Sequence, residues 1–243
     1  MRTLYFKEIS SFLSSLIGYI VITIFLTVIG LFMWVFPGEF NILDAGYANI
    51  DTLFIIAPWV FMFLIPAVTM RMFADEKKSG TIELLLTRPL TDIQIILGKY
   101  LAGLTLVILS LLPTLVYYYS AQVLGNPTGN IDTGGMWGSY LGLLFLASAF
   151  VSIGIFSSSV TENQIIAFII GVFLSFFFFI GFESISTLAM FGKIDSVILH
   201  FGINEHYISM SRGVIDSRDV IYYLSLIGVF LLLTRTVLES RKW

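Results

Sequence analysis

Residues 53–70, LFIIAPWVFMFLIPAVTM, and residues 100–123, YLAGLTLVILSLLPTLVYYYSAQV, are two long apolar segments joined by the most polar stretch of the chain. That stretch, residues 71–100, reads RMFADEKKSGTIELLLTRPLTDIQIILGKY. A bilayer core about 30 Å thick needs roughly 20 apolar helical residues per crossing. Each apolar segment is therefore long enough to span a membrane, with a charged connection between the two.

The same criterion applied outward from these segments finds six membrane spans in the 243 residues. They are expected over residues 16–36, 53–70, 100–123, 136–156, 165–182 and 220–233. Six spans leave only short connections, so no separate soluble domain is expected. The sequence predicts an all-α polytopic membrane protein, with one transmembrane domain over residues 1–243.

Composition supports this class and excludes others. Hydrophobic residues make up 57% of the chain and charged residues only 12%, whereas a soluble domain usually has about 25% charged residues. The net charge of −3 excludes a nucleic-acid binder that relies on a basic surface. The chain has no cysteine and two histidines, so no metal site or cofactor of its own is expected.

The distribution of Lys and Arg predicts the orientation, because cytoplasmic connections carry an excess of basic residues. With the N-terminus in the cytoplasm, ten of the 13 basic residues fall on that side. The other three are Lys193, Arg212 and Arg218. Both termini are therefore expected in the cytoplasm.

The polar stretch 71–100 is expected to be a cytoplasmic loop that forms a helix, a turn and a second helix. Gly80 follows Ser79 at the turn, residues 81–86 form a short amphipathic run, and Pro89 ends it. Thr91 is the expected N-cap of a helix that continues into the third span. A short helix with charges and leucines suits docking of a cytoplasmic partner. The alternative is a solvated loop whose charges only fix the topology.

The first 15 residues are expected to form an interfacial helix in the plane of the membrane. Apolar residues recur there at helical spacing, and Lys7 and Glu8 lie between them. The apolar positions are Leu4, Tyr5, Ile9, Phe12 and Leu13. The alternative is a simple extension of the first span.

Small residues predict a packing face on the fourth span. Gly138 and Gly142 are four residues apart, and Ser148 and Ser152 continue the pattern. Such faces let helices approach closely in a membrane. The motif is common in apolar helices, so it predicts packing and no particular partner.

Residues 76–99 resemble the pattern E-x3-G-T-x-E-x-L-L-x2-P-x8-G-K of ABC type-2 transporter permeases, which lies between the second and third of six spans. FKEISSFLSSLIGY, residues 6–19, resembles the amphipathic helix and the entry to the first span in that family. SRGVIDSRDVIYYLSL, residues 211–226, resembles the gliding-motility-associated branch of these permeases, the GldF type.

The resemblance implies the membrane subunit of an ATP-driven exporter in the bacterial inner membrane. Two permease subunits, identical or different, would pair with two cytoplasmic ABC ATPases that bind the ATP. This fits the absence of a G-x-x-x-x-G-K-[ST] phosphate loop from the sequence. Lipids would surround the spans, and no nucleic acid is expected as a partner. The cargo would be linked to gliding motility and protein secretion, or would be a lipid or drug-like amphipath.

By the same resemblance, residues 75–99 contain the coupling helix that seats in the ATPase. The implied coupling residues are Glu76, Gly80, Thr81, Glu83, Leu84, Leu85, Pro89, Gly98 and Lys99. Thr161 and Glu162, in the turn between the fourth and fifth spans, are a secondary contact, although Thr161 could simply cap the fifth span. Residues 183–219 would form an extracytoplasmic re-entrant region.

Two other classes of function are weighed against a permease. An intramembrane enzyme would need a catalytic set at membrane depth, such as paired aspartates or H-E-x-x-H, and Asn204-Glu205-His206 is not that motif. A metal site made by His200, Glu205 and His206 is a further alternative. The third class is a membrane scaffold without transport activity, which would not need the coupling loop.

Overall fold

The computed structural model describes residues 1–46, 48–86, 91–188 and 192–240, with the side chains of 84–86 and 193 left aside. Its regular elements are all helical over these ranges. In chain order they are α1 (Arg2–Leu13), α2 (Leu16–Trp34), α3 (Asp51–Thr69), α4 (Arg71–Lys78), α5 (Thr81–Leu86), α6 (Asp92–Leu111), the 3-10 turn η1 (Leu112–Thr114), α7 (Leu115–Leu124), α8 (Thr133–Val160), α9 (Gln164–Phe176), the π-helical turn η2 (Phe177–Gly181), α10 (Phe182–Thr187), the 3-10 turn η3 (Gly192–Ile194), α11 (Asp195–Leu199), α12 (Ile203–Met210) and α13 (Ser217–Glu239).

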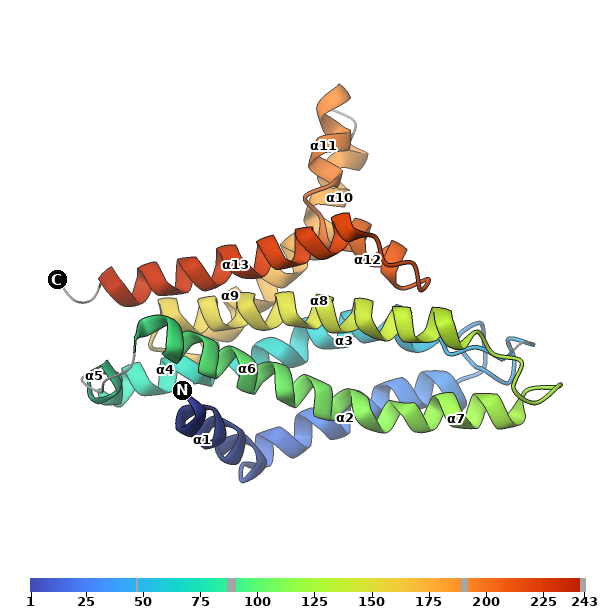
Figure 1. The fold of residues 1–243 in the computed structure, drawn as a ribbon, viewed down its shortest axis with the longest axis horizontal. Coiled ribbons are helices and arrows are strands. Elements are labelled where there is room, and N and C mark those ends of the chain that lie inside the picture. Colours follow the sequence, from blue (N-terminus) through green and yellow to red (C-terminus); the bar gives the residue numbers. More distant parts are fainter. Residues whose placement is uncertain (47, 87–90, 189–191, 241–243) are drawn as a thin grey trace.

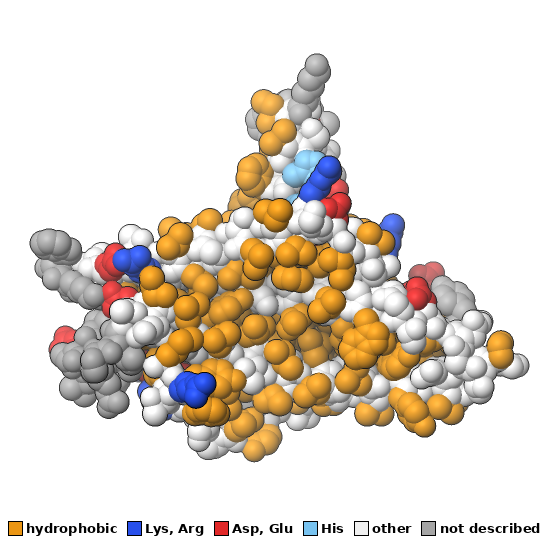
Figure 2. Space-filling view, viewed as in Figure 1, with side chains coloured by type: hydrophobic (Ala, Val, Ile, Leu, Met, Phe, Trp, Pro, Cys, Tyr) orange, Lys and Arg blue, Asp and Glu red, His pale blue; other side chains and the backbone are white. Residues whose placement is uncertain are grey.

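Six helical segments of the described chain are long and apolar enough to cross a membrane, which confirms the predicted number. They are Leu16–Trp34, Asp51–Lys78, Asp92–Leu124, Thr133–Val160, Gln164–Thr187 and Ser217–Glu239. Figure 2 shows hydrophobic side chains over the middle of one face, with charged side chains toward its two ends and at the base of the arm that projects from it. This distribution fits a membrane-spanning bundle.

Five of the six spans are longer in the structure than the sequence pattern suggested, and the extensions of the second and the fifth matter most. The second continues past Met70 to Lys78, and the fifth continues past Phe182 to Thr187. Hydropathy ends a span at the first charged residues, but helix geometry continues wherever backbone bonds and packing allow. As a result, much of the expected 71–100 loop is helix, and Glu183 lies within a helical segment that is long and apolar enough to span.

Helix α8 lies at the centre of the bundle and packs against α3, α6, α9 and α13. It is buried along most of its length, whereas only 22% of the spans that contain α2, α9 and α13 is buried. Glycine permits the close approach of α8 to α3, because a Cβ on Gly154 would lie 2.0 Å from Thr69 Oγ1. The core therefore surrounds α8, and the outer spans face lipid or a partner.

The two ends of the bundle differ (Figure 1). Helices α1, α4 and α5 lie at one end with the last turns of α13, and we call this the α5 end. At the opposite end, α7 and the start of α8 extend furthest. Helices α10 and α11 pack on each other and stand away from the bundle, and we call these two helices the side arm.

Candidate functional site

A buried lysine joins three helices at the α5 end. Lys99 of α6 is fully buried, and its Nζ lies 3.0 Å from Glu8 Oε1 of α1 and 3.0 Å from Glu76 Oε2 of α4. It also donates a hydrogen bond of 2.6 Å to the carbonyl of Met72. Lys7 Nζ lies 3.2 Å from Glu76 Oε1. We call Lys7, Glu8, Glu76 and Lys99 the Lys99 joint.

The Lys99 joint is balanced in charge, with two lysines and two glutamates, although the buried Glu76 Oε2 accepts no hydrogen bond. Lys99 Nζ donates to Glu8 Oε1 and to the carbonyl of Met72, and Glu76 Oε2 lies 3.0 Å away as an ion-pair partner. The Phe73 ring lies 5.0 Å away and adds a cation–π contact. Removing one partner of such a buried cluster leaves an uncompensated charge, which costs about 3–5 kcal/mol. The joint thus fixes α1 and α4 on α6.

Helix α1 also packs on α6 beside the joint. Leu4 lies against Gly98, where an added Cβ would be 3.4 Å from Leu4 Cδ2. Tyr5 and Thr105 share a hydrogen bond of 2.8 Å between their hydroxyls. The buried face of α1 consists of Leu4, Glu8 and Phe12. The expected face was therefore partly wrong, since it left out Glu8, and Glu8 is buried because Lys99 supplies the opposite charge.

Helix α8 holds α4 from the other side. Ser158 Oγ accepts hydrogen bonds from the backbone N–H groups of Phe73 and Ala74, at 3.0 and 3.1 Å, and donates to the carbonyl of Met70. These are amides of the first turn of α4, which lack partners within the helix. Lys77 is buried and donates to the carbonyl of Ser159. Helix α4 is thus held between the Lys99 joint and α8.

The turn after α4 presents α5 outward. Gly80 has φ +70, a left-handed conformation that favours glycine. Ser79 Oγ donates to the carbonyl of Asp75, and the hydroxyls of Ser79 and Thr81 lie 2.8 Å apart. Thr81 and Glu83 are exposed, whereas Ile82 is buried. The turn is therefore defined by local bonds, and one face of α5 is open.

The structure separates the expected coupling residues into two groups. Glu76 and Lys99 belong to the Lys99 joint, and Gly98 packs beside it against Leu4, so the side chain of Lys99 is not accessible from outside. Gly80 shapes the turn, and Thr81 and Glu83 face outward. The side chains of Leu84 and Leu85 and the whole of Pro89 lie outside the described residues.

Helix α6 begins where the sequence predicted. Thr91 Oγ1 accepts from the backbone N–H of Gln94, and the Gln94 side chain accepts from the backbone N–H of Thr91. This reciprocal pair is a capping box. It confirms Thr91 as the N-cap and sets the start of the helix that carries Lys99.

The turn between α8 and α9 lies beside α4. Gln164 donates a side-chain hydrogen bond to Asp75 of α4. Thr161 ends α8, and its Oγ1 accepts from the backbone N–H of Asn163, while Glu162 is exposed. The N-cap of α9 is Asn163 and not Thr161, because Asn163 Oδ1 accepts from the backbone N–H of Ile165.

The small-residue face of α8 lies against the segment that follows α12. A Cβ on Gly138 would lie 2.6 Å from the Cα and carbonyl oxygen of Gly213, and a Cβ on Gly142 would lie 2.6 Å from Met210 Cβ. Ser139 Oγ donates to the carbonyl of Ser211 at 2.8 Å. These glycines therefore bring α12 and the turn after it against α8.

The two histidines lie near the base of the side arm. His206 Nδ1 is 2.7 Å from Asp219 Oδ1, and its Nε2 is 2.9 Å from the carbonyl oxygen of His200. Its ring stacks on Tyr222, with centroids 3.9 Å apart. No group of three potential metal ligands occurs in the described part of the chain. The arrangement is a structural contact between α12, α13 and the arm.

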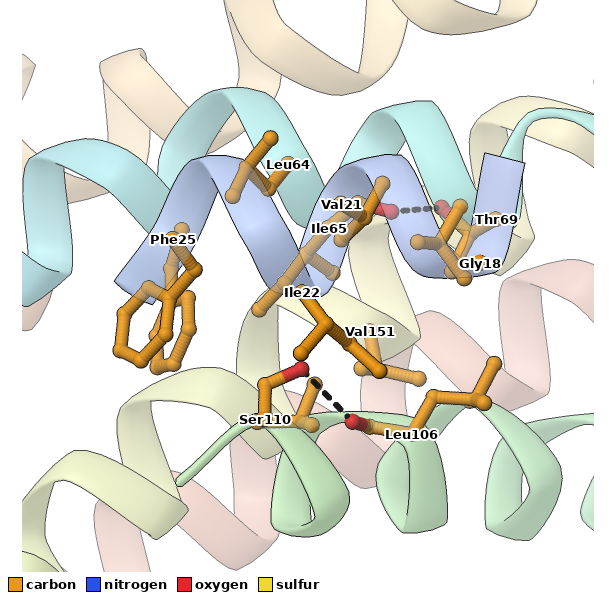
Figure 3. Close-up of a pocket in the computed structure, with 14 residues that line it drawn as sticks. Gly18, Val21, Ile22, Phe25, Leu64, Ile65, Thr69, Leu106, Ser110 and Val151 are labelled. Atoms are coloured by element: carbon orange, nitrogen blue, oxygen red, sulfur yellow. Dashed lines mark hydrogen bonds between the residues drawn. The ribbon is translucent and has the colours of Figure 1, made fainter. Parts of the chain in front are cut away.

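A small apolar cavity lies where α2, α3, α6 and α8 meet (Figure 3). Its volume is about 20 Å³, and Gly18, Phe25 and Val151 are among its lining residues. The hydroxyls of Thr69 and Ser110 donate to carbonyls of their own helices, so they have no proton left to donate to a ligand. A cavity this small holds about one water. It is a packing defect of the core and no substrate site.

Sequence reasoning missed the partners that complete the α5 end. Glu8 lies in the segment read as interfacial and Ser158 in the polar turn after the expected fourth span, and their roles depend on residues far along the chain. One signal was available for Glu8, because it shares a helix face with Leu4 and Phe12 at four-residue spacing. No local signal distinguishes Ser158 from its neighbours Ser157 and Ser159.

A family model described as ABC-2 family transporter protein matches residues 3–198 of the chain. A search of curated proteins found no match. The matched residues run from α1 into α11 and include the Lys99 joint and α5. Together with the six apolar helices, they show that the chain is a multi-pass membrane protein that belongs to the ABC-2 transporter family, the membrane component of ABC transporters.

Proposed function

We propose that the chain is the permease subunit of an ATP-driven exporter and that it couples to a separate cytoplasmic ATPase through α5. The α5 end would face the cytoplasm, as the excess of basic residues at this end favours. A second permease subunit would complete the pathway across the membrane, and the ATPases would bind the ATP.

The observation that carries this proposal is the difference in burial between α5, which is largely exposed, and α4, which is held against the core. Half of α4 is buried, with Met72, Phe73, Ala74 and Lys77 facing the core. Directly after it, Ser79, Gly80, Thr81 and Glu83 are exposed. An exposed turn and helix that follow a fixed helix are suited to contact another protein, because they lose little conformational entropy on binding.

The contacts of α4 offer a route by which a movement of α5 would reach the membrane spans. Helix α4 continues α3 with a break at Met70, and Ser158 of α8 bonds across that break. The Lys99 joint ties the same helix to α6 and α1. A push on α5 would therefore reach the second, third and fourth spans as a unit, since tightly packed elements shift together.

Charge reversal at α5 tests the coupling. We expect Glu83→Lys, and deletion of residues 79–86, to abolish co-purification of the full chain with its ATP-binding-cassette subunit. The matched control is Glu39→Lys, which reverses an exposed carboxylate in the connection between α2 and α3. Normal association of both α5 variants would overturn the proposal. Unfolding temperatures equal to wild type would show that the fold is intact.

A narrower form of the proposal links export to gliding motility. It rests on the likeness of residues 211–226 to the gliding-motility branch, and most of these residues form the start of α13. Deletion of the gene in its host should then abolish surface spreading, while growth in liquid continues. Normal spreading would remove the motility link and leave the exporter proposal in place.

A further inference from the structure

A larger cavity lies at the base of the side arm, between α3, the π-helical turn, α10 and α12. Its volume is about 540 Å³, within the range of pockets that hold drug-sized ligands. Phe54, Pro58, Trp59 and Phe179 supply its apolar wall. The π-helical turn brings Phe179 and Ile180 to the cavity, and such turns often occur at functional sites.

Glu183 is the one charged side chain among the described residues that line this cavity. It is half-buried, and it lies within the candidate span Gln164–Thr187. Asn204 Nδ2 donates to Glu183 Oε2 at 2.8 Å and so orients the carboxylate. No ion pair joins Glu183 to a basic group in the described part of the chain. An ionisable side chain inside a spanning helix usually marks a functional site.

The aromatic wall next to Glu183 suits a cation. Trp59 packs edge-to-face on Phe179, with ring centroids 5.9 Å apart, and is 48% exposed, so part of its indole remains free. Aromatic faces attract cations within about 6 Å. Tyr207 is not a competing charge, because burial raises its pKa and its hydroxyl donates to the carbonyl of Phe54 at 2.6 Å.

We propose that this cavity binds a cationic amphipath, a molecule with a protonated amine and an apolar body. The amine would bond to Glu183, which accepts but cannot donate when ionised, and the apolar body would lie against Trp59 and Phe179. An anionic ligand is disfavoured, because the only lining charge among the described residues is negative. The inference rests on the proposed exporter function and specifies the chemistry of its cargo.

A matched pair of ligands tests the charge recognition directly. The full chain is placed in nanodiscs of zwitterionic phosphatidylcholine, and equilibrium dialysis measures binding of naphthylmethylamine and of the neutral naphthylmethanol, with empty nanodiscs as the blank. We expect the amine to bind at least about tenfold tighter than the alcohol, as a hydrogen bond to a charged group implies.

Two variants then test whether the carboxylate of Glu183 causes the preference for the amine. Glu183→Gln keeps an oxygen that can accept from Asn204 but removes the charge, so the preference for the amine should fall to nearly one. The control is Glu205→Gln, which removes an exposed carboxylate next to Asn204 that does not line the cavity, and the preference should stay as in wild type. An unchanged preference in Glu183→Gln, or no preference in wild type, overturns the site.

The outcome is independent of the coupling test, because no ATPase is present in the dialysis. Suppose that amine binding depends on Glu183 but the α5 variants still associate normally with the ATPase. The ligand site would then stand, and the proposed coupling would be overturned. Loss of ATPase association together with no preference for the amine would support the exporter and exclude cationic cargo at this cavity.

Discussion

The Lys99 joint and the His206 contact both link helices through charged or polar side chains, yet they differ in what surrounds them. Lys99 is fully buried, and the helix it ties down, α4, buries four of its eight residues. His206 ties the base of the side arm to α13, but α10 and α11 bury no side chain. At the Lys99 joint, the ionic contacts add to extensive packing of buried side chains. At the side arm, the contacts of His206 hold the helices without such packing.

This difference indicates where the molecule is stiff and where it can move. Regions with few buried contacts open at low free energy, and regions within the core open only with the whole fold. The α5 end is therefore suited to transmit force, and the side arm is suited to change position. Both ring nitrogens of His206 face oxygens that accept hydrogen bonds, those of Asp219 and of the His200 backbone.

The largest expected effect is loss of the buried cation. Lys99→Met leaves Glu8 and Glu76 facing each other without it, so we expect a destabilisation of about 3–5 kcal/mol. Thermal unfolding in detergent measures it, and a cysteine placed at Leu4 should become accessible to a thiol reagent. Lys78→Met, which removes an exposed lysine at the end of α4, serves as the control. Equal unfolding temperatures for the two variants would remove the mechanical role of the joint.

The next effect concerns packing of α12 on α8. Gly138→Ala places a methyl group 2.6 Å from backbone atoms of Gly213, which cannot rotate away. Such overpacking costs about 1–3 kcal/mol. Gly228→Ala adds the same methyl group on α13 where nothing lies within 4 Å, and it should be neutral. A neutral Gly138→Ala would mean that α12 sits further from α8 than the structure shows.

The Lys99 joint and the contact of Gly138 with Gly213 also show what the sequence could and could not predict. The six spans followed from apolar runs, and the N-cap at Thr91 followed from local residues, because both depend on neighbours in the chain. The partner of Gly138 could not be derived in this way, since Gly213 is 75 residues further along the chain. A repeat of small residues predicts contact but names no partner.

The candidate site shows the same limit. The motif in residues 76–99 identified Glu76, Gly80 and Lys99, but assigned all of them to contact with another protein. Lys99 pairs with Glu8, which lies 91 residues earlier in the chain, and sequence periodicity cannot predict such a tertiary contact. Glu183 was placed outside the fifth span because hydropathy falls there, although the helix continues to Thr187.

A smaller and local effect is expected at the side arm. His206→Leu keeps an apolar side chain against Tyr222 but loses both polar contacts, so hydrogen exchange in α10 and α11 should accelerate roughly tenfold, while exchange in α4 and α6 stays unchanged. His200→Ala is the control, because the contact uses only the backbone carbonyl of His200. Acceleration throughout the bundle would contradict the assignment of the arm as a separate, loosely held unit.

The smallest effect comes from the N-cap of α13, which lies close to the His206 contact in the chain. The hydrogen bond from the backbone N–H of Arg218, at 2.9 Å, and the nearby Arg218 charge hold the pKa of Asp216 below its ordinary value of 3.8. A carboxyl with a lowered pKa in the folded state contributes stability above its ordinary pKa, and the contribution is lost as the pH falls through the folded value.

Asp216→Asn keeps a side-chain oxygen that can cap the helix but does not titrate. Its unfolding temperature should therefore differ from that of wild type by about one degree above roughly pH 5, and the difference should shrink toward pH 3. Asp216→Ala, which removes the cap, should be less stable than Asp216→Asn at every pH. A difference between wild type and Asp216→Asn that does not depend on pH would show that the cap is held by geometry alone. In that case the charge of Asp216 would not stabilise the end of α13 next to the arm, whereas charges do stabilise the Lys99 joint.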